Sequence, residues 1–317
     1  MIPFYLSLLP GEHIYSWWIR LYWLSGRSNK ALYFKEIGVK PDELKANIPL
    51  TKSCQKVCQL SAIILNNNQI AVQATELPLW VLSMSFDRYR FFRCRVHKNQ
   101  VPANLHVANH SGVIQNLVRW KACPKCTAED LERYGASYWH VKHQIHGVSV
   151  CNKHSTLLIT PKQEGRTLKS ISLPHQIRDW ESLIDVMIPQ HYLFSEFCSN
   201  VYELALKDSD LLILLKNKFW KICGVEEIRV KDRKSLIESL ELEIEAELGN
   251  YFLSSIFSYY SSAYKTKRRK IVYTLYMSTN CKYVDPVFWL VTLFWKRKEL
   301  GLIEEFFDEP TASIQNI

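Results

Sequence analysis

The sequence predicts a mostly α-helical protein in three parts, and three features of the chain support that fold class. Apolar residues recur at helical spacing between residues 13 and 65, and again through the C-terminal half. Between these regions, cysteines and a histidine form two closely spaced pairs, a pattern typical of a small zinc-stapled segment with short strands. We therefore expect an N-terminal helix-turn-helix-like bundle at 1–118, a zinc-finger segment at 119–160 and a C-terminal helical domain at 161–317.

Three short helices are predicted in the first part. Residues 13–24 carry a wide apolar stripe, and Gly26 ends this helix. A second helix is capped by Ser28 and runs through Ile37, and a third spans 53–65. Tight turns between short helices are compatible with a helix-turn-helix unit, although small helical domains that bind nothing share this pattern.

The C-terminal half begins after a linker predicted at 161–174. Helical apolar spacing covers 176–215 and 219–257, with glutamates on one side near 241–247 and an interruption at Gly249. We expect this acidic face to be solvated. Docking of a basic partner on it is the less favoured interpretation. Two further helices are predicted: an aromatic helix at 251–264 and another at 288–300.

Composition limits the class of protein. Of the 317 residues, 47% are hydrophobic and 13% aromatic, which excludes intrinsic disorder over most of the chain because disordered sequences lack such residues. The formal net charge of +9 favours anionic partners, of which nucleic acid is the commonest.

The cysteines and the apolar runs predict a cytoplasmic protein that does not contact a membrane. Nine irregularly spaced cysteines fit a reducing compartment better than a disulfide framework. The N-terminus has neither the basic region nor the cleavage site of a signal peptide, and the longest apolar run, around 288–295, is far shorter than a membrane span.

The two ligand pairs are Cys123-Pro-Lys-Cys126 and Cys151-Asn-Lys-His154. A tight turn brings both members of a pair to one side of an ion, and the long insert returns the second pair to the other side. Four protein ligands leave no position for water, so the pattern predicts one structural Zn²⁺ and not a catalytic metal.

Other interpretations of these residues remain open. The thiols and the imidazole could instead pack as reduced core residues, or form a Cys–His nucleophilic dyad. His140, His143 and His146 could ligate a metal or contact phosphate, but such residues are more often surface or outer-sphere histidines. Cys54 and Cys58 stand four apart on a predicted helix, where burial is a better explanation than a second metal pair.

Basic residues form two candidate contact regions for nucleic acid or a partner. In the first, five cations within six positions exceed what capping a helix end requires: Lys265, Lys267, Arg268, Arg269 and Lys270. The second, at 88–98, includes Arg93 and Arg95, but interleaved phenylalanines also fit a half-buried strand.

Sequence signatures of catalysis are missing from the chain. There is no GxxxxGK[ST] loop for nucleotide phosphates, and no GxSxG, HExxH or kinase signature set. We therefore expect a protein that is not an enzyme and that does not hydrolyse ATP itself.

The zinc segment and the N-terminus carry further motifs. Within and around the ligand pairs these are Cys123-Pro124-Lys125-Cys126, Arg133-Tyr134-Gly135, Tyr138-Trp139, Gly147 and Cys151-Asn152-Lys153-His154. Near the N-terminus they are Pro10, Glu12, Ser16, Arg20 and Gly26, of which Glu12, Ser16 and Arg20 would share one helix face. Over about half of its length the chain thus resembles the TniQ/TnsD family, the target-selection proteins of heteromeric transposons that also encode an AAA+ regulator. A second cysteine knuckle found in some relatives is missing.

The resemblance implies a transposition adaptor. One face would bind target DNA or a DNA-bound, CRISPR RNA-guided effector complex, and another would recruit the AAA+ ATPase regulator. The chain is short for the branch that reads an attachment site directly, whereas Arg133–Gly135 and residues 252–270 resemble that branch. Whether the chain forms a homo-oligomer stays open.

Two functions from other classes remain as alternatives. A zinc-stabilised transcription regulator would bind a specific duplex tightly without partners and would not bind an ATPase. A zinc-dependent hydrolase would need an exchangeable metal position.

Overall fold

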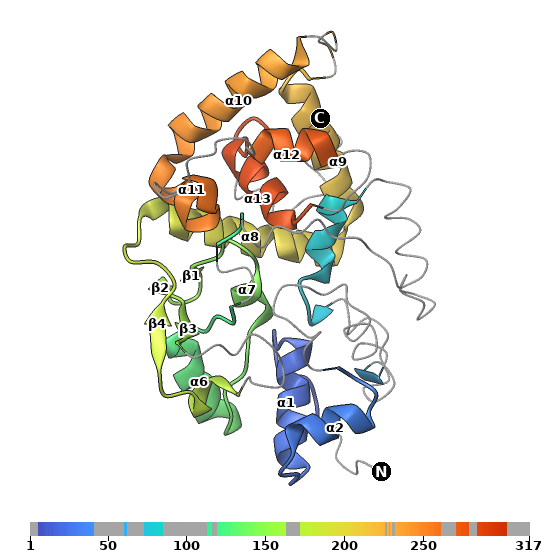
Figure 1. The fold of residues 1–317 in the computed structure, drawn as a ribbon, viewed down its shortest axis with the longest axis vertical. Coiled ribbons are helices and arrows are strands. Elements are labelled where there is room, and N and C mark those ends of the chain that lie inside the picture. The colour runs from blue at the N-terminus through green and yellow to red at the C-terminus, as the bar shows by residue number, and fades with distance from the viewer. Residues whose placement is uncertain are drawn as a thin grey trace. The chain divides into compact units, whose positions relative to one another are not determined.

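The computed structural model confirms a mostly helical chain with two small antiparallel sheets (Figure 1). It describes residues 6–40, 60–61, 73–84, 113–115, 119–162, 172–225, 227, 229, 232–260, 271–278 and 284–302. The chain divides into two compact units. Unit 1 comprises Met1–Leu77, Arg90–Leu105 and Asn116–Met187, and unit 2 comprises Pro78–Tyr89, His106–Gln115 and Ile188–Ile317. The N-terminal helices and the Cys/His segment thus fall in the same unit, while the predicted division into three domains stays a prediction.

Unit 1 begins with two short helices, α1 (Ile14–Leu24) and α2 (Lys30–Glu36). Both Trp17 and Trp18 of α1 are fully buried, as the apolar stripe predicts. The cap of α2 is Asn29 and not the predicted Ser28, because the Asn29 side chain accepts the backbone N–H of Leu32 at 2.9 Å. Of the third predicted helix only residues 60–61 are described, and both are helical.

A buried ion pair lies at the start of α1. The Nε and Nη2 atoms of Arg20 each donate to a carboxylate oxygen of Glu12 at 2.8 Å, and the backbone N–H of Leu9 adds a third bond at 3.0 Å. Glu12 was predicted to share one helix face with Ser16 and Arg20, but it precedes α1, and the ion pair with Arg20 brings the two side chains together. On the same helix, the Ser16 hydroxyl accepts the backbone N–H of Trp139 at 3.0 Å, which joins α1 to the Cys/His segment.

The rest of unit 1 surrounds the Cys/His segment with short elements. They are α6 (Pro124–Tyr134), α7 (Val141–Gln144), β1 (Val150–Cys151), β2 (Thr156–Leu157), β3 (Ile159–Pro161), the 3-10 helix η3 (Pro174–Gln176) and β4 (Trp180–Ser182). Antiparallel pairs form between β1 and β2 and between β3 and β4. The predicted short strands near the ligands are therefore confirmed.

The helix predicted from residue 176 is wrong in its first part. Residues 180–182 pair with β3 as strand β4, and the helix begins only at Pro189. A proline disfavours helical backbone in the residue before it and has no N–H to donate, so Pro189 can start a helix but not continue one.

Unit 2 is a helical domain. Its helices are α8 (Pro189–Lys207), α9 (Asp210–Ile222), α10 (Arg233–Leu248), α11 (Asn250–Ile256), α12 (Ile271–Met277) and α13 (Pro286–Trp295), with the 3-10 helices η2 (Leu77–Ser83, its first residue in unit 1) and η4 (Ser258–Tyr260). All residues of α13 are buried, and α13 contacts α8, α9, α10 and α12 (Figure 1). A helix that is apolar on every side can be stable only in such a position.

Three expectations for this unit need correction. The helix predicted at 288–300 spans Pro286–Trp295, and the one predicted at 251–264 ends at Ile256, before η4. The acidic face of α10 is not wholly solvated. Glu241 is fully buried, and its carboxylate accepts the backbone N–H of Tyr273 at 2.9 Å, whereas Glu243 and Glu247 are exposed.

Candidate metal centre

Two local turns present the four predicted ligands. Cys123 is the N-cap residue of α6 and Pro124 takes the first helical position, so Cys126 lies in the first turn of this helix. Cys151 ends β1, and His154 lies in the turn that connects β1 to β2. Each pair is thus held by a tight turn, as the spacing of two intervening residues predicts.

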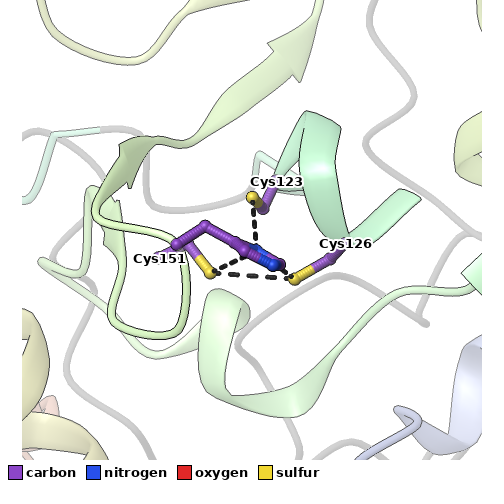
Figure 2. Close-up of side chains that lie close together, drawn as sticks. Cys123, Cys126 and Cys151 are labelled. Atoms are coloured by element: carbon purple, nitrogen blue, oxygen red, sulfur yellow. Dashed lines mark hydrogen bonds between the residues drawn. The ribbon is translucent and has the colours of Figure 1, made fainter. Parts of the chain in front are cut away.

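The side chains of the two pairs converge on one point (Figure 2). The Nδ1 atom of His154 lies 3.5 Å from Sγ of Cys123, 3.3 Å from Sγ of Cys126 and 3.7 Å from Sγ of Cys151. The sulfurs of Cys126 and Cys151 are 3.7 Å apart. A zinc tetrahedron with Zn–S bonds of about 2.3 Å has S–S edges of about 3.8 Å, so these residues fit a tetrahedral ion.

The electrostatics of the cluster also favour a cation. Hydrogen bonds from Cys126 and Cys151 lower the pKa of the Cys123 thiol, and the same contacts with Cys123 raise the pKa values of Cys126 and Cys151. One thiolate is therefore stabilised at the expense of the other two, because three adjacent negative charges repel each other. A divalent cation removes this conflict by stabilising all three thiolates. The four residues could hold one metal ion such as zinc.

Two side chains outside the ligand set contact the ligands. Glu129 of α6 accepts a hydrogen bond from Nε2 of His154 at 3.0 Å and another from the ammonium of Lys153. His143 is buried, with its Nε2 atom 4.0 Å from Sγ of Cys126. Burial lowers the pKa of His143 well below its usual value, so the imidazole is neutral, and its N–H can be donated to the sulfur.

A buried lysine stabilises the segment that precedes β1. The Lys121 ammonium donates to the carbonyls of Ile145 and Val148 at 2.7 and 2.8 Å. The Gln144 amide bonds both backbone groups of Lys121, at 2.9 and 2.8 Å. Neither Lys121 nor Gln144 was predicted, and neither was Glu129, because a single polar residue carries no sequence signal for a partner more than twenty positions away.

The remaining candidate residues have other surroundings. Of the three histidines beside the ligands, His140 contacts Asp130 at 2.8 Å, and His143 and His146 are buried. The four-residue cluster includes none of them, although His143 contacts Cys126. The described cysteines beyond the cluster, Cys198 and Cys223, are buried in unit 2. The remaining predicted positions lie outside the described residues: Cys54, Cys58, Arg93, Arg95, Lys265, Lys267, Arg268, Arg269 and Lys270.

Comparison with protein families places the centre in a known domain. Residues 3–158 match the model of the TniQ family. The chain carries a TniQ domain. All four clustered residues and the Glu12–Arg20 ion pair lie within the match. A comparison with curated proteins gives no match. Among the helices that the structure describes, none combines the length and the apolar character needed to cross a bilayer.

Proposed function

We propose that this protein is a target-selection adaptor in DNA transposition. It would bind target DNA, or an RNA-guided effector complex already seated on that DNA, and recruit the AAA+ ATPase regulator of the transposase. The observation that supports this role is the TniQ domain at residues 3–158, with the four-ligand cluster inside it.

In this proposal Cys123, Cys126, Cys151 and His154 hold one Zn²⁺ as a structural ion. The donor set is complete with four protein atoms, so the ion would stabilise the fold of the segment and would not activate water. The protein would accordingly be an adaptor and not an enzyme, and ATP hydrolysis would belong to its AAA+ partner.

A basic cluster, Lys265 to Lys270, is proposed as the contact to nucleic acid or nucleoprotein. Each lysine or arginine that neutralises a phosphate releases a counterion, so such contacts make the affinity depend on salt. In the RNA-guided branch, base pairing with the guide would supply the sequence specificity, and these cations would add affinity alone.

The test uses the triple variant Lys267→Ala/Arg268→Ala/Arg269→Ala. Binding is measured over a range of salt concentrations with two probes, a mixed-sequence DNA duplex and the RNA-guided effector bound to its target. We expect weaker binding to at least one probe, and a slope of log affinity against log salt that is smaller by about 2 to 3.

The matched control replaces three exposed lysines of unit 2, Lys207, Lys221 and Lys298, by alanine. It removes the same charge from other positions, so an equal loss in both variants would indicate a general effect of net charge. An unchanged slope in the first variant would remove the basic cluster from the interface.

Recruitment is tested separately with a candidate AAA+ ATPase regulator from the same transposon. Co-purification of the two proteins on target DNA is expected. Tight sequence-specific binding to a duplex, without any affinity for an ATPase, would contradict the adaptor role and support a transcription regulator.

A further inference from the structure

We propose that Glu129 positions the metal ligand His154, by accepting its Nε2–H and so directing its Nδ1 atom at the three sulfurs. This inference rests on the zinc site proposed above. It assigns a role to a residue that belongs to neither ligand pair.

The two nitrogens of the His154 ring have different partners. The three sulfur atoms lie 3.3 to 3.7 Å from Nδ1, whereas Nε2 lies 3.0 Å from Oε1 of Glu129. A neutral imidazole carries one N–H, and a carboxylate can only accept a hydrogen bond. The proton therefore belongs on Nε2, which leaves the Nδ1 lone pair for the ion.

Helix α6 supplies both sides of this arrangement. Cys126 and Glu129 are three residues apart on α6 and so lie on the same helix face. The thiol of Cys126 reaches the ion position, and the carboxylate of Glu129 reaches the outer edge of the His154 ring. Helix α6 thus supplies the ligand Cys126 and also the carboxylate that orients the ligand His154.

Lys153 holds the carboxylate in place. Its ammonium donates to Oε2 of Glu129, and so the two carboxylate oxygens have separate donors on adjacent residues, 153 and 154. Both Lys153 and Glu129 are largely exposed, with side-chain exposures of 66% and 48%. An exposed pair of this kind contributes little to stability by itself. Its effect should therefore be seen in metal binding and not in the fold.

Metal affinity is the property to measure. A carboxylate that accepts the second N–H of a ligating histidine raises its basicity and restricts its rotation, and loss of such a partner typically weakens metal binding 10- to 100-fold. We expect Glu129→Ala to weaken zinc binding within about that range, measured by competition with a chromophoric chelator. Glu129→Gln should lose less, because the amide oxygen still accepts the Nε2–H.

The matched control is Glu132→Ala. Glu132 is an exposed glutamate on the same helix, so this substitution changes the charge of α6 equally and should leave the zinc affinity unchanged. Circular dichroism at saturating zinc should be the same for all variants. Visible spectra of the Co²⁺-loaded proteins should differ for Glu129→Ala alone, because the His154 ring is less constrained.

The outcomes separate this inference from the metal site itself. Wild-type protein with one zinc, together with equal affinities for Glu129→Ala and Glu132→Ala, would overturn the role of Glu129 and leave the site intact. If wild-type protein contains no zinc as purified and takes up none when zinc is added, both the zinc site and the role of Glu129 are overturned.

Discussion

His191 illustrates how a single buried polar residue is stabilised in unit 2. Its side chain is buried at the first turn of α8, where Nδ1 accepts the backbone N–H of Ile188 at 3.2 Å. The Nε2 atom bonds the Ser255 hydroxyl at 3.0 Å. Desolvation lowers the pKa of His191 to about 4, because the buried ring is costly to protonate.

This pKa predicts a loss of stability in acid. The unfolded chain binds a proton near the ordinary value of about 6.5, whereas the folded protein binds it only near pH 4. The unfolded state therefore carries more protons between these values, and stability falls as the pH drops through that window. From about pH 8 to pH 5 we expect a loss of about 2 kcal/mol from this residue, measured by urea unfolding.

The control for this prediction is His191→Gln. Glutamine at this position can still accept the Ile188 N–H, as in a capping box, but it does not titrate. The variant should lose less stability than wild type between pH 8 and pH 5. Equal losses in the two proteins would show that His191 is not the titrating group.

Residues of this kind were the hardest to predict. The glutamate periodicity of α10 predicted a solvated face, yet Glu241 is fully buried with a backbone partner on α12. Burial of a charged group depends on the partner that the fold supplies, and periodicity gives no information about that partner.

At the scale of elements, α6 supplies three residues of the proposed zinc site: Cys123 at its N-cap, Cys126 and Glu129. The helix ends at Gly135, which has a φ of +70° and whose backbone N–H bonds the Leu131 carbonyl. Glycine adopts this left-handed conformation without strain, whereas a residue with a Cβ atom does so at a cost.

Substitution at Gly135 tests this C-cap. A Cβ atom there would meet no other atom within 4 Å, so the effect is one of backbone conformation alone. We expect Gly135→Ala to lower the free energy of unfolding by about 1 kcal/mol. Gly135→Asn should lower it less, because asparagine tolerates the left-handed region better.

Thermal unfolding of the zinc-loaded proteins measures both changes. A larger loss for asparagine than for alanine would contradict the conformational explanation.

The predicted break at Gly249, between α10 and α11, is confirmed. This residue has a φ of +79°, which glycine adopts more easily than residues with a Cβ atom.

Elements were predicted well where one local pattern decides them. The apolar stripe of α1 and the continuous apolar run of α13 were both predicted to be helical, and both segments are helices. Strand β4 was not predicted, because a strand of three residues is stable only through its pairing with β3. The spacing of apolar residues within a segment does not indicate a partner that is distant in the sequence.

At the scale of the whole molecule, the division into two units predicts that metal loss has a limited effect. Cys126→Ser removes one thiolate of the cluster, so its zinc content should fall well below one ion per chain. Structural zinc contributes about 10–16 kcal/mol to the folding of zinc-finger peptides, so residues 119–162 should lose their protection from proteases. The fragment containing α8 to α13, in the other unit, should stay protected.

The matched control is Cys223→Ser, which changes a buried cysteine of unit 2 in the same way. It should keep one zinc ion and a protected Cys/His segment. Full zinc occupancy of Cys126→Ser, or a metal-free protein with an intact segment, would contradict the structural role of the ion.

The sequence by itself determined the helical class, the absence of catalytic signatures and the four candidate ligands, because each of these depends on residues a few positions apart. Cys123 and Cys126, like Cys151 and His154, are separated by one tight turn whose geometry is local. The meeting of the two pairs was predicted from their spacing, but only the tertiary structure gave its distances and showed that Glu129 contacts Nε2 of His154. Such contacts join residues 25 or more positions apart, and their free energy depends on the packing of the whole unit, which no local pattern encodes.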